Sequence, residues 1–180
     1  CAKNDLRKKK QQTGNLPKHL REATFANANL NYYETDLLTD SGMNYRENAQ
    51  KIYSLASSFV QKINSENSSR GLIIEGPIGS GKSYLLGCVA NALIDRGVHF
   101  RYIVYSDLLQ QIRSTYNQII DHRYREEKPI IISTNYSIKN LKNRFPVMGE
   151  RIFQRLLEMN KYLELAGNVR VKKIEEQQEA

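Results

Sequence analysis

The most regular hydrophobic pattern in the sequence covers residues 46–63. Apolar residues recur there at spacings of three or four, which is the period of a helix that buries one face. A polar run follows at residues 64–70 and interrupts the pattern. The spacing therefore predicts a helix over 46–63. The residues expected to face the core are Ala49, Ile52, Leu55, Ala56, Phe59 and Ile63.

Short apolar runs elsewhere in the chain predict strands. Residues 72–75 (LIIE) and 130–133 (IIIS) lack polar alternation, as is typical of strands that are buried on both faces of a parallel sheet. Residues 98–105 (VHFRYIVY) are rich in β-branched and aromatic side chains and predict a further strand. Residues 161–171 (KYLELAGNVRV) are typical of a β-hairpin with its turn at Gly167 and Asn168.

Helical patterns separate these strands. The predicted helices cover residues 82–95, 107–116, 118–127, 137–141 and 149–160. In the first of them Leu85, Leu86, Val89 and Leu93 point inward, and Gly97 ends the helix. Strands and helices that alternate in this way indicate an α/β domain with a mainly parallel sheet.

Composition divides the 180 residues into three parts. Residues 1–20 are charged and rich in glutamine, and we expect them to be a basic arm or linker. Residues 21–171 carry the alternating pattern and form one domain, which is long enough for a sizeable core. Residues 172–180 are a polar tail.

The net charge of +8 is unevenly spread. Residues 1–30 hold seven Lys or Arg against Asp5 and Glu22, which gives this segment a charge of +5. Such a run attracts phosphate backbones, and it is equally typical of a solvated arm. Eleven tyrosines accompany the charge and could stack on single-stranded nucleic acid, but most fit core or rim positions, so none is assigned to it.

Several other classes of protein are disfavoured. No apolar run approaches the ~20 residues that span a bilayer, and no signal peptide is visible, so we expect a cytoplasmic protein without a membrane partner. Cys88 fits an apolar helical pattern as a core residue, whereas Cys1 could be the trailing edge of a zinc module. The three histidines (His19, His99 and His122) stand at no metal-ligand spacing.

Residues 76–83 (GPIGSGKS) fit the pattern G-x-x-x-x-G-K-[ST] at every fixed position. The context fits too, because a buried strand is predicted before the motif and a helix after it. Successive amides of such a P-loop form an anion-binding nest at a helix N-terminus. Lys82 can reach the β- and γ-phosphates of ATP, and the Ser83 hydroxyl can coordinate Mg²⁺. The predicted nucleotide-binding residues are Gly76, Pro77, Ile78, Gly79, Ser80, Gly81, Lys82, Ser83 and Tyr84.

Hydrolysis requires more than this loop. A P-loop ATPase needs an acidic residue on a neighbouring strand to hold Mg²⁺, and often a second carboxylate to activate water. No apolar run in this sequence is followed by Asp-Asp or Asp-Glu. The nearest candidate is Asp107, which fits the N-cap of a helix better than a magnesium ligand.

The chain resembles the AAA+ replicative helicase loaders of the DnaC/DnaI type and, more distantly, the IstB transposition ATPases. The likeness covers most of residues 15–171. It begins at LPKHLREATFAN (16–27) and includes the P-loop segment, but the more specific phrases are IIDHRYREEKPIIISTN (119–135) and GERIFQRL (149–156). The resemblance implies a three-layer α/β/α P-loop fold with little or no lid, and weak ATPase activity in the isolated fragment.

The resemblance also implies residue roles and partners. Asn135 matches the sensor 1 position, where a polar side chain orients water near the γ-phosphate. Arg151 matches the arginine finger that reaches the ATP of a neighbouring subunit, and Arg155 is the substitute candidate one turn later. With Lys82, these are the expected catalytic residues. The implied partners are a hexameric replicative helicase, single-stranded DNA and further copies of the chain, and residues 1–20 could end a helicase-binding domain.

One departure from the loader pattern concerns the acidic strand. Loaders carry a segment ending in two acidic residues before the IIDHRY helix, whereas this sequence passes directly from Asn117 to Gln118. Either a βα unit is absent from this sequence between Asn117 and Gln118, or the protein is a degenerate ATPase. Three other functions stay open: an IstB-type transposition helper, a non-hydrolysing nucleotide-binding adaptor and, with less support because no arginine-rich lid is visible, a small-molecule kinase.

Overall fold

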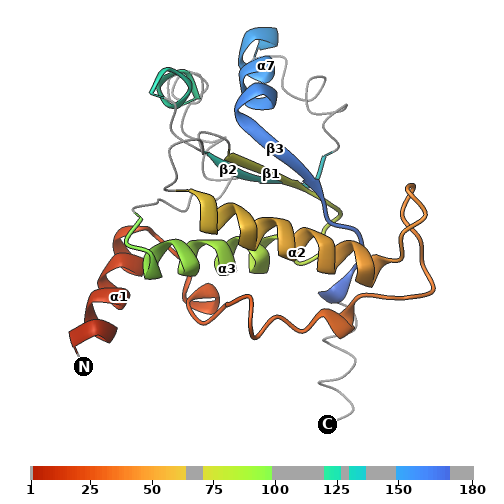
Figure 1. The fold of residues 1–180 in the computed structure, drawn as a ribbon, viewed down its shortest axis with the longest axis horizontal. Helices are drawn as coiled ribbons and strands as arrows, with labels where there is room; N and C mark the ends of the chain where they lie inside the picture. Colours follow the sequence, from red (N-terminus) through yellow and green to blue (C-terminus); the bar gives the residue numbers. More distant parts are fainter. Residues whose placement is uncertain (1, 64–70, 99–119, 127–129, 137–148, 171–180) are drawn as a thin grey trace.

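The computed structural model describes residues 2–63, 71–98, 120–126, 130–136 and 149–170 (Figure 1). The described helices and strands are α1 (Ala2–Thr13), α2 (Tyr45–Lys62), β1 (Gly71–Glu75), α3 (Lys82–Asp95), β2 (Ile131–Thr134), α7 (Gly149–Met159) and β3 (Asn160–Glu164). Two 3-10 turns, Lys18–Leu20 and Leu30–Tyr32, lie in the segment between α1 and α2.

The described strands form a parallel sheet in the order β2-β1-β3. Glu75 at the end of β1 pairs with Thr134 of β2 and with Glu164 of β3, so the carboxyl ends of all three strands meet at one edge. The predicted α/β fold with a mainly parallel sheet is confirmed. Ligands of open α/β sheets bind outside this edge.

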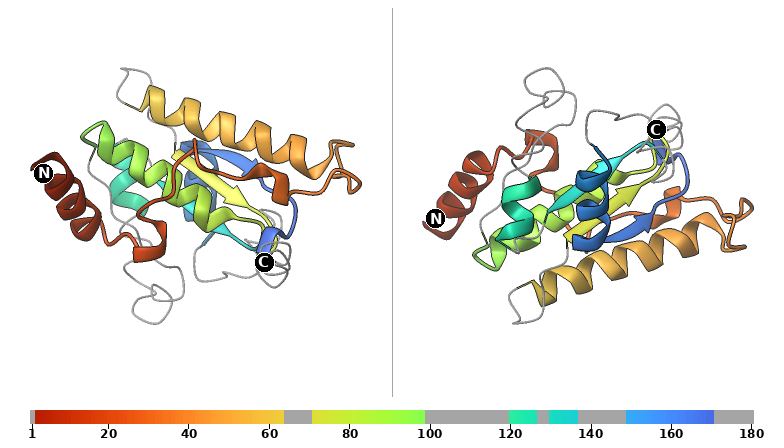
Figure 2. Two further views of the ribbon diagram at one scale, coloured as in Figure 1. Left: turned by 90° about the horizontal axis from the view of Figure 1, so that it is seen from below. Right: turned by 90° about the horizontal axis from the view of Figure 1, so that it is seen from above.

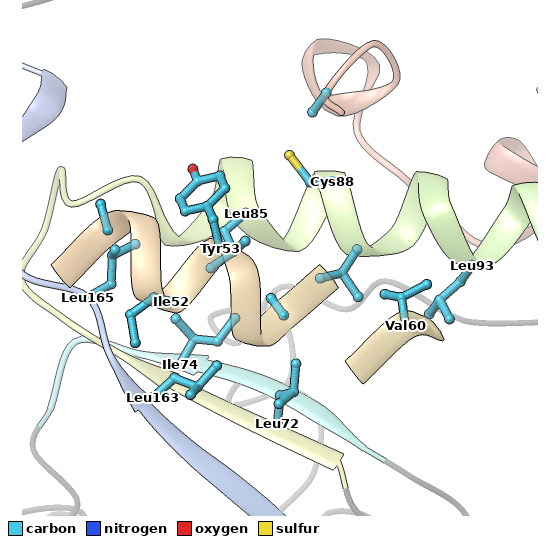
Figure 3. Close-up of a cluster of buried hydrophobic side chains, with 14 of the residues drawn as sticks. Ile52, Tyr53, Val60, Leu72, Ile74, Leu85, Cys88, Leu93, Leu163 and Leu165 are labelled. Carbon is cyan, nitrogen blue, oxygen red and sulfur yellow. The ribbon is translucent and has the colours of Figure 1, made fainter. Parts of the chain in front are cut away.

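The sheet lies between two layers of helices, and side-chain alternation along β1 explains why. Leu72 and Ile74 point to α2 and α3 and are fully buried there with Leu85, Cys88 and Leu163, among others (Figure 3). Ile73 points to the opposite face, where it packs against Ile120 and Leu156. Figure 2 shows α2 and α3 over one face and α7 with the helical residues 120–125 over the other. The predicted three-layer arrangement follows from a strand that is apolar on both sides.

Helix α2 begins where its sequence provides a capping box. The Asn44 side chain accepts a hydrogen bond from the Glu47 amide (2.9 Å), and the Glu47 carboxylate accepts one from the Asn44 amide (3.2 Å). The helix matches the predicted range 46–63 within one residue at each end. Likewise, α3 has the predicted bounds, and β1, β2 and α7 lie within a residue or two of theirs.

The predicted hairpin over residues 161–171 is wrong. Asn160–Glu164 pairs in parallel with β1, and the chain does not turn back on itself after Gly167, because residues 169–170 begin a helical turn. The alternation of Tyr162, Leu163 and Glu164 fits any half-buried strand and does not specify its partner. Leu163 and Leu165 enter the core beside α2 and α3, and that burial decides the pairing.

Residues 1–20 also differ from a simple arm. Residues 2–13 form α1, and the following Leu16 and Leu20 are buried against Ala90 of α3. Gln11 is 3% exposed, and its amide donates to Asn91 Oδ1 (2.8 Å) and to the Arg21 carbonyl (2.9 Å). A buried hydrogen-bonded side chain therefore fixes α1 on the domain.

Some predictions fall outside the described residues. These are the strand over 98–105 beyond Val98, the helices over 107–116 and 137–141, the Asn117–Gln118 junction, the tail, and the environments of Cys1, His99 and Asp107. Across the described residues, no helix is both long and apolar enough to cross a membrane.

Candidate nucleotide-binding site

The glycine loop, residues 76–81, connects the carboxyl end of central strand β1 to the first turn of α3. Two of its glycines have left-handed backbone angles, with φ of 87° at Gly79 and 88° at Gly81. Residues that carry a Cβ rarely adopt such backbone angles, which is the physical reason for glycine at these two positions. At Gly81, moreover, a Cβ would lie 2.7 Å from the Tyr33 hydroxyl oxygen.

Lys82 closes the glycine loop into a ring. Its ammonium donates to the carbonyls of Gly76 (2.8 Å) and Pro77 (2.7 Å), and it makes a longer contact of 3.4 Å with Ser80 Oγ. An ammonium has three N–H donors, so the long contact is the one that a phosphate oxygen can replace. Lys82 is 8% exposed, and this burial lowers the pKa of its ammonium. An anion beside it would favour the charged form.

Tyr33 anchors the glycine loop through a buried hydrogen bond. Its hydroxyl donates to the Ser80 carbonyl at 2.8 Å, and both residues are buried, at 2% and 0% exposure. Burial raises the pKa of the Tyr33 hydroxyl to about 12, so it stays a donor throughout the physiological range. The Arg46 guanidinium donates to the Tyr33 carbonyl at 3.3 Å and to the Asn31 carbonyl at 3.0 Å, which fixes the Tyr33 segment on α2.

The chain after β3 lies along the other side of the glycine loop. We call residues 164–170, which begin at the last residue of β3, the C-terminal loop. This loop places Leu165, Asn168 and Val169 beside Gly76, Gly79 and Gly81 respectively. The Leu165 amide donates to the Glu75 carbonyl at 2.7 Å, and the Arg170 Cβ lies 3.4 Å from the Cβ position of Gly79. Arg170 is exposed.

The other predicted nucleotide-binding residues occupy the rim or the first turn of α3. Pro77 and Ile78 are exposed, Ile78 at 71%. Ser83 is exposed on the first turn of α3, beside Lys82. The Tyr84 hydroxyl donates to Asn27 Oδ1 at 2.7 Å, which ties the segment before α2 to α3. The structure therefore brings the predicted loop residues together, while their roles toward a nucleotide stay predictions.

Asn135 follows β2 at the same edge of the sheet. The preceding Thr134 carbonyl accepts a hydrogen bond from the Gly76 amide (3.2 Å), so β2 lies directly beside the strand that leads into the glycine loop. Asn135 is exposed. Its position suits a group that orients water, and this role stays a prediction.

The two arginine candidates lie on α7, which covers the face of the sheet opposite α2 and α3 (Figure 2). Arg155 forms an ion pair with Asp121 and stacks over the Tyr124 ring at 4.8 Å. A role for it as a substitute finger would require it to leave these partners. Arg151 lies on the same helix, and its side chain is outside the described part of the structure. Neither assignment is tested by the geometry.

The described residues include no cluster of three or more His, Cys, Asp or Glu side chains that could hold a metal ion. The predicted Mg²⁺ ligand Ser83 lies beside the glycine loop, on the first turn of α3.

Sequence reasoning missed Tyr33 and the C-terminal loop. Tyr33 lies in a weakly periodic segment that carries no motif, so no local signal marks it. For Asn168 and Arg170, the dipeptide Gly-Asn was a misleading signal, because it also fits a hairpin turn. Gly167 in the loop after β3 was the available hint of close backbone approach.

Three solved structures share this architecture. DnaI matches with a TM-score of 0.65 and 20% identity over 86% of this chain and 94% of that chain. A candidate primosome component from Streptococcus pyogenes serotype M3 matches with a TM-score of 0.61 and 19% identity, over 84% and 90%. The DnaC helicase loader matches with a TM-score of 0.56 and 19% identity, over 83% and 99%. The chain has the fold of DnaC/DnaI-type loaders.

This loader fold is established by shape rather than by sequence. No family model matches the sequence, and neither does any curated protein. Identities of 19–20% to the loader structures are compatible with a shared fold and divergent details. The loader fold accounts for the parallel sheet with the glycine loop at the carboxyl end of its central strand.

Proposed function

We propose that this chain is the nucleotide-binding domain of a replicative helicase loader. One observation carries the proposal: the ring that Lys82 closes around the glycine loop, at the N-terminus of α3, on a fold shared with DnaC and DnaI. The ring places an ammonium at the N-terminus of a helix, and this combination suits a polyphosphate.

The residues fit ATP with Mg²⁺ in distinct ways. The amides of residues 79–83 would hold the phosphates, Lys82 would balance their charge, and Ser83 would contribute a hydroxyl ligand to Mg²⁺. Bound ATP·Mg²⁺ supplies the phosphoanhydride whose hydrolysis times the release of a partner. Asn135 would orient the water, and Arg151 would reach the nucleotide of a neighbouring copy, so that hydrolysis requires assembly.

The partners that we propose are a hexameric replicative helicase and single-stranded DNA. The similarity to the DnaC helicase loader supports the first. The basic residues of α1 and the following turn support the second, since exposed Lys8 and Lys18 can contact phosphates without sequence preference. Binding through such contacts weakens steeply with salt.

The test begins with nucleotide binding by the full chain. A fluorescent ATP analogue, N-methylanthraniloyl-ATP, is titrated against the parent, Lys82→Ala and Lys51→Ala. We expect Lys82→Ala to weaken binding at least tenfold, because a charge-assisted contact to phosphate is lost. Lys51→Ala changes an exposed lysine on α2 and should leave binding unchanged. Equal affinity in all three proteins would dismiss the phosphate cradle.

The partner test measures association with the helicase of the same organism and with an oligonucleotide, each in ATP, in ADP and without nucleotide. Nucleotide-dependent binding to the helicase is the expected result. Absence of binding to helicase and DNA in every state would refute the loader function.

A second candidate is a nucleotide-binding adaptor that does not hydrolyse ATP. The sequence favours it at one point, because no Asp-Asp or Asp-Glu follows an apolar run. ATPase rates of the parent and Lys82→Ala, measured with helicase and DNA present, separate the two. Equal and negligible rates in both proteins, despite nucleotide binding by the parent, would favour the adaptor.

A further inference from the structure

Asn48 lies on the first turn of α2 and is 8% exposed. Its carboxamide bonds to main-chain groups more than 100 residues away in the sequence, with sequence separations of 116 and 118. Its Nδ2 donates to the Glu164 carbonyl at 3.0 Å, and its Oδ1 accepts from the Ala166 amide at 3.0 Å. The carboxamide therefore acts like a peptide group of an added strand, satisfying one acceptor and one donor at the point where β3 ends.

The segment that Asn48 holds is the C-terminal loop. Between its two bonds lies Leu165, whose amide donates to the Glu75 carbonyl immediately before the glycine loop. After Ala166 the chain continues along the glycine loop. Asn168 Oδ1 and Arg170 Cβ lie beside Gly79, and the Val169 side chain lies beside Gly81. Figure 1 shows the chain leaving β3 toward the N-terminal end of α2.

We propose that Asn48 is a positioning residue for the nucleotide site, acting through the C-terminal loop on the glycine loop; this role rests on the proposed function. The carboxamide holds the C-terminal loop through hydrogen bonds to residues 164 and 166. The C-terminal loop in turn contacts the glycine loop from residue 76 to residue 81. Asn48 itself does not touch the glycine loop in any hydrogen bond of the described structure.

The alternative is that Asn48 only stabilises the fold. Two partly buried hydrogen bonds contribute to stability wherever they lie, so a drop in melting temperature does not distinguish the two roles. Asn44 offers a matched control. It caps the same helix one turn earlier, and its loss destabilises α2. Its side chain accepts a hydrogen bond from the Glu47 amide, and its main-chain carbonyl, which Asn44→Ala keeps, accepts one from the Asn48 amide.

The experiment compares Asn48→Ala, Asn48→Asp and Asn44→Ala with the parent in three measurements. The first is hydrogen exchange of the Ala166 amide by NMR. Asn48→Ala removes the acceptor, so exchange should accelerate by at least tenfold, whereas Asn48→Asp keeps an acceptor and should preserve most of the protection. Asn44→Ala should leave the protection of Ala166 at the parent level.

The second measurement is the NMR position of the amides of Gly76, Gly79 and Gly81 without nucleotide. Both Asn48 variants should shift these signals, since Asn48→Asp loses the donor to Glu164 and places a carboxylate against that carbonyl. The third is the Kd for N-methylanthraniloyl-ATP. We expect it to rise about tenfold in both Asn48 variants and less than twofold in Asn44→Ala.

Each outcome bears on a different claim. If the parent binds the nucleotide but glycine-loop amides and Kd are the same in Asn48→Ala as in the parent, the positioning role is refuted. Equal losses of affinity in Asn44→Ala and Asn48→Asp would refute it as well, because general destabilisation would then suffice. Should the parent bind no nucleotide, the proposed function fails, and the positioning role fails with it, whatever the amide signals show.

Discussion

The hydroxyl of Tyr33 donates a hydrogen bond to the main-chain carbonyl of Ser80, 47 residues later in the sequence, at a distance of 2.8 Å. Both groups are buried, so neither can exchange the bond for one to water. The bond fixes the middle of the glycine loop to the segment before α2. It thus couples the shape of a phosphate-binding loop to a part of the chain that has no motif.

The first prediction concerns this bond. Tyr33→Phe keeps the ring and leaves the Ser80 carbonyl without its partner, so the free energy of unfolding should fall by about 1–2 kcal/mol. Affinity for the ATP analogue should fall too, because the loop loses a restraint. Urea unfolding and nucleotide titration measure the two effects. Tyr32→Phe, at the half-buried neighbouring position, is the control and should match the parent. An unchanged stability of Tyr33→Phe would show that the hydroxyl contributes nothing.

Regular elements could be predicted wherever local pattern and tertiary burial agree. α2 and α3 carry helical periodicity on the face that they bury, and β1 is apolar on both faces because both are covered. The glycine loop was predictable because its backbone angles demand glycine at Gly79 and Gly81. In these places the chemistry of a few adjacent residues determines the structure.

The rest could not be predicted because it depends on distant partners. The alternation in residues 161–165 specifies a strand but leaves its neighbour open, and the parallel pairing with β1 comes from burial of Leu163 and Leu165. The charged sequence of α1 suggests a solvated arm, whereas the buried Gln11 side chain and an ion pair between Arg7 and Asp95 attach this helix to α3. Tyr33 and Asn48 bond to main-chain carbonyl groups, which every residue has. No sequence pattern therefore predicts these two bonds.

A second prediction concerns the buried network that docks α1. Asn91 is 1% exposed; its Nδ2 donates to the carbonyls of Leu20 (2.8 Å), Ala23 (2.8 Å) and Gly87 (3.0 Å), and its Oδ1 accepts from Gln11. Asn91→Ala leaves buried groups without partners and should cost about 3 kcal/mol or more. Gln11→Ala should cost less, about 1–2 kcal/mol.

The double variant provides the check on this network. Because Gln11 and Asn91 bond to each other, we expect the two losses to be non-additive by about 1 kcal/mol in urea unfolding. Strictly additive losses would indicate that α1 does not depend on the Gln11–Asn91 bond.

A third prediction concerns pH. Burial raises the pKa of the Cys88 thiol to about 12 from an ordinary value of 9. Between pH 9 and 12 the unfolded chain therefore releases a proton that the folded chain retains, so stability falls as pH rises, by at most about 1.4 kcal/mol per unit from this group. Below pH 9 the contribution is fully present.

Urea unfolding of the parent and of Cys88→Ala between pH 8.5 and 10 measures this effect. At pH 8.5 the free energy of unfolding should be lower for Cys88→Ala than for the parent, because the substitution leaves a small cavity. It should then fall more slowly as the pH rises. This window lies mostly below the titration of unfolded tyrosines, several of which also have raised pKa values in the fold. Parallel pH profiles for the two proteins would contradict a buried neutral thiol.

The last prediction separates backbone strain from steric overlap in the glycine loop. Gly81 has φ of 88°, and a Cβ there would lie 2.7 Å from the Tyr33 hydroxyl oxygen, whereas Gly97 has φ of 78° with nothing within 4 Å. Gly97→Ala should therefore lower the free energy of unfolding only by the backbone strain, about 1 kcal/mol, whereas Gly81→Ala should lower it clearly more. Since Tyr33→Phe removes the overlapping oxygen, Gly81→Ala should be less costly in that background, and Gly97→Ala should cost the same in both. Urea unfolding of the three single and two double variants tests this. If Gly81→Ala lowers the free energy of unfolding equally with and without the hydroxyl, Tyr33 does not limit the space at residue 81.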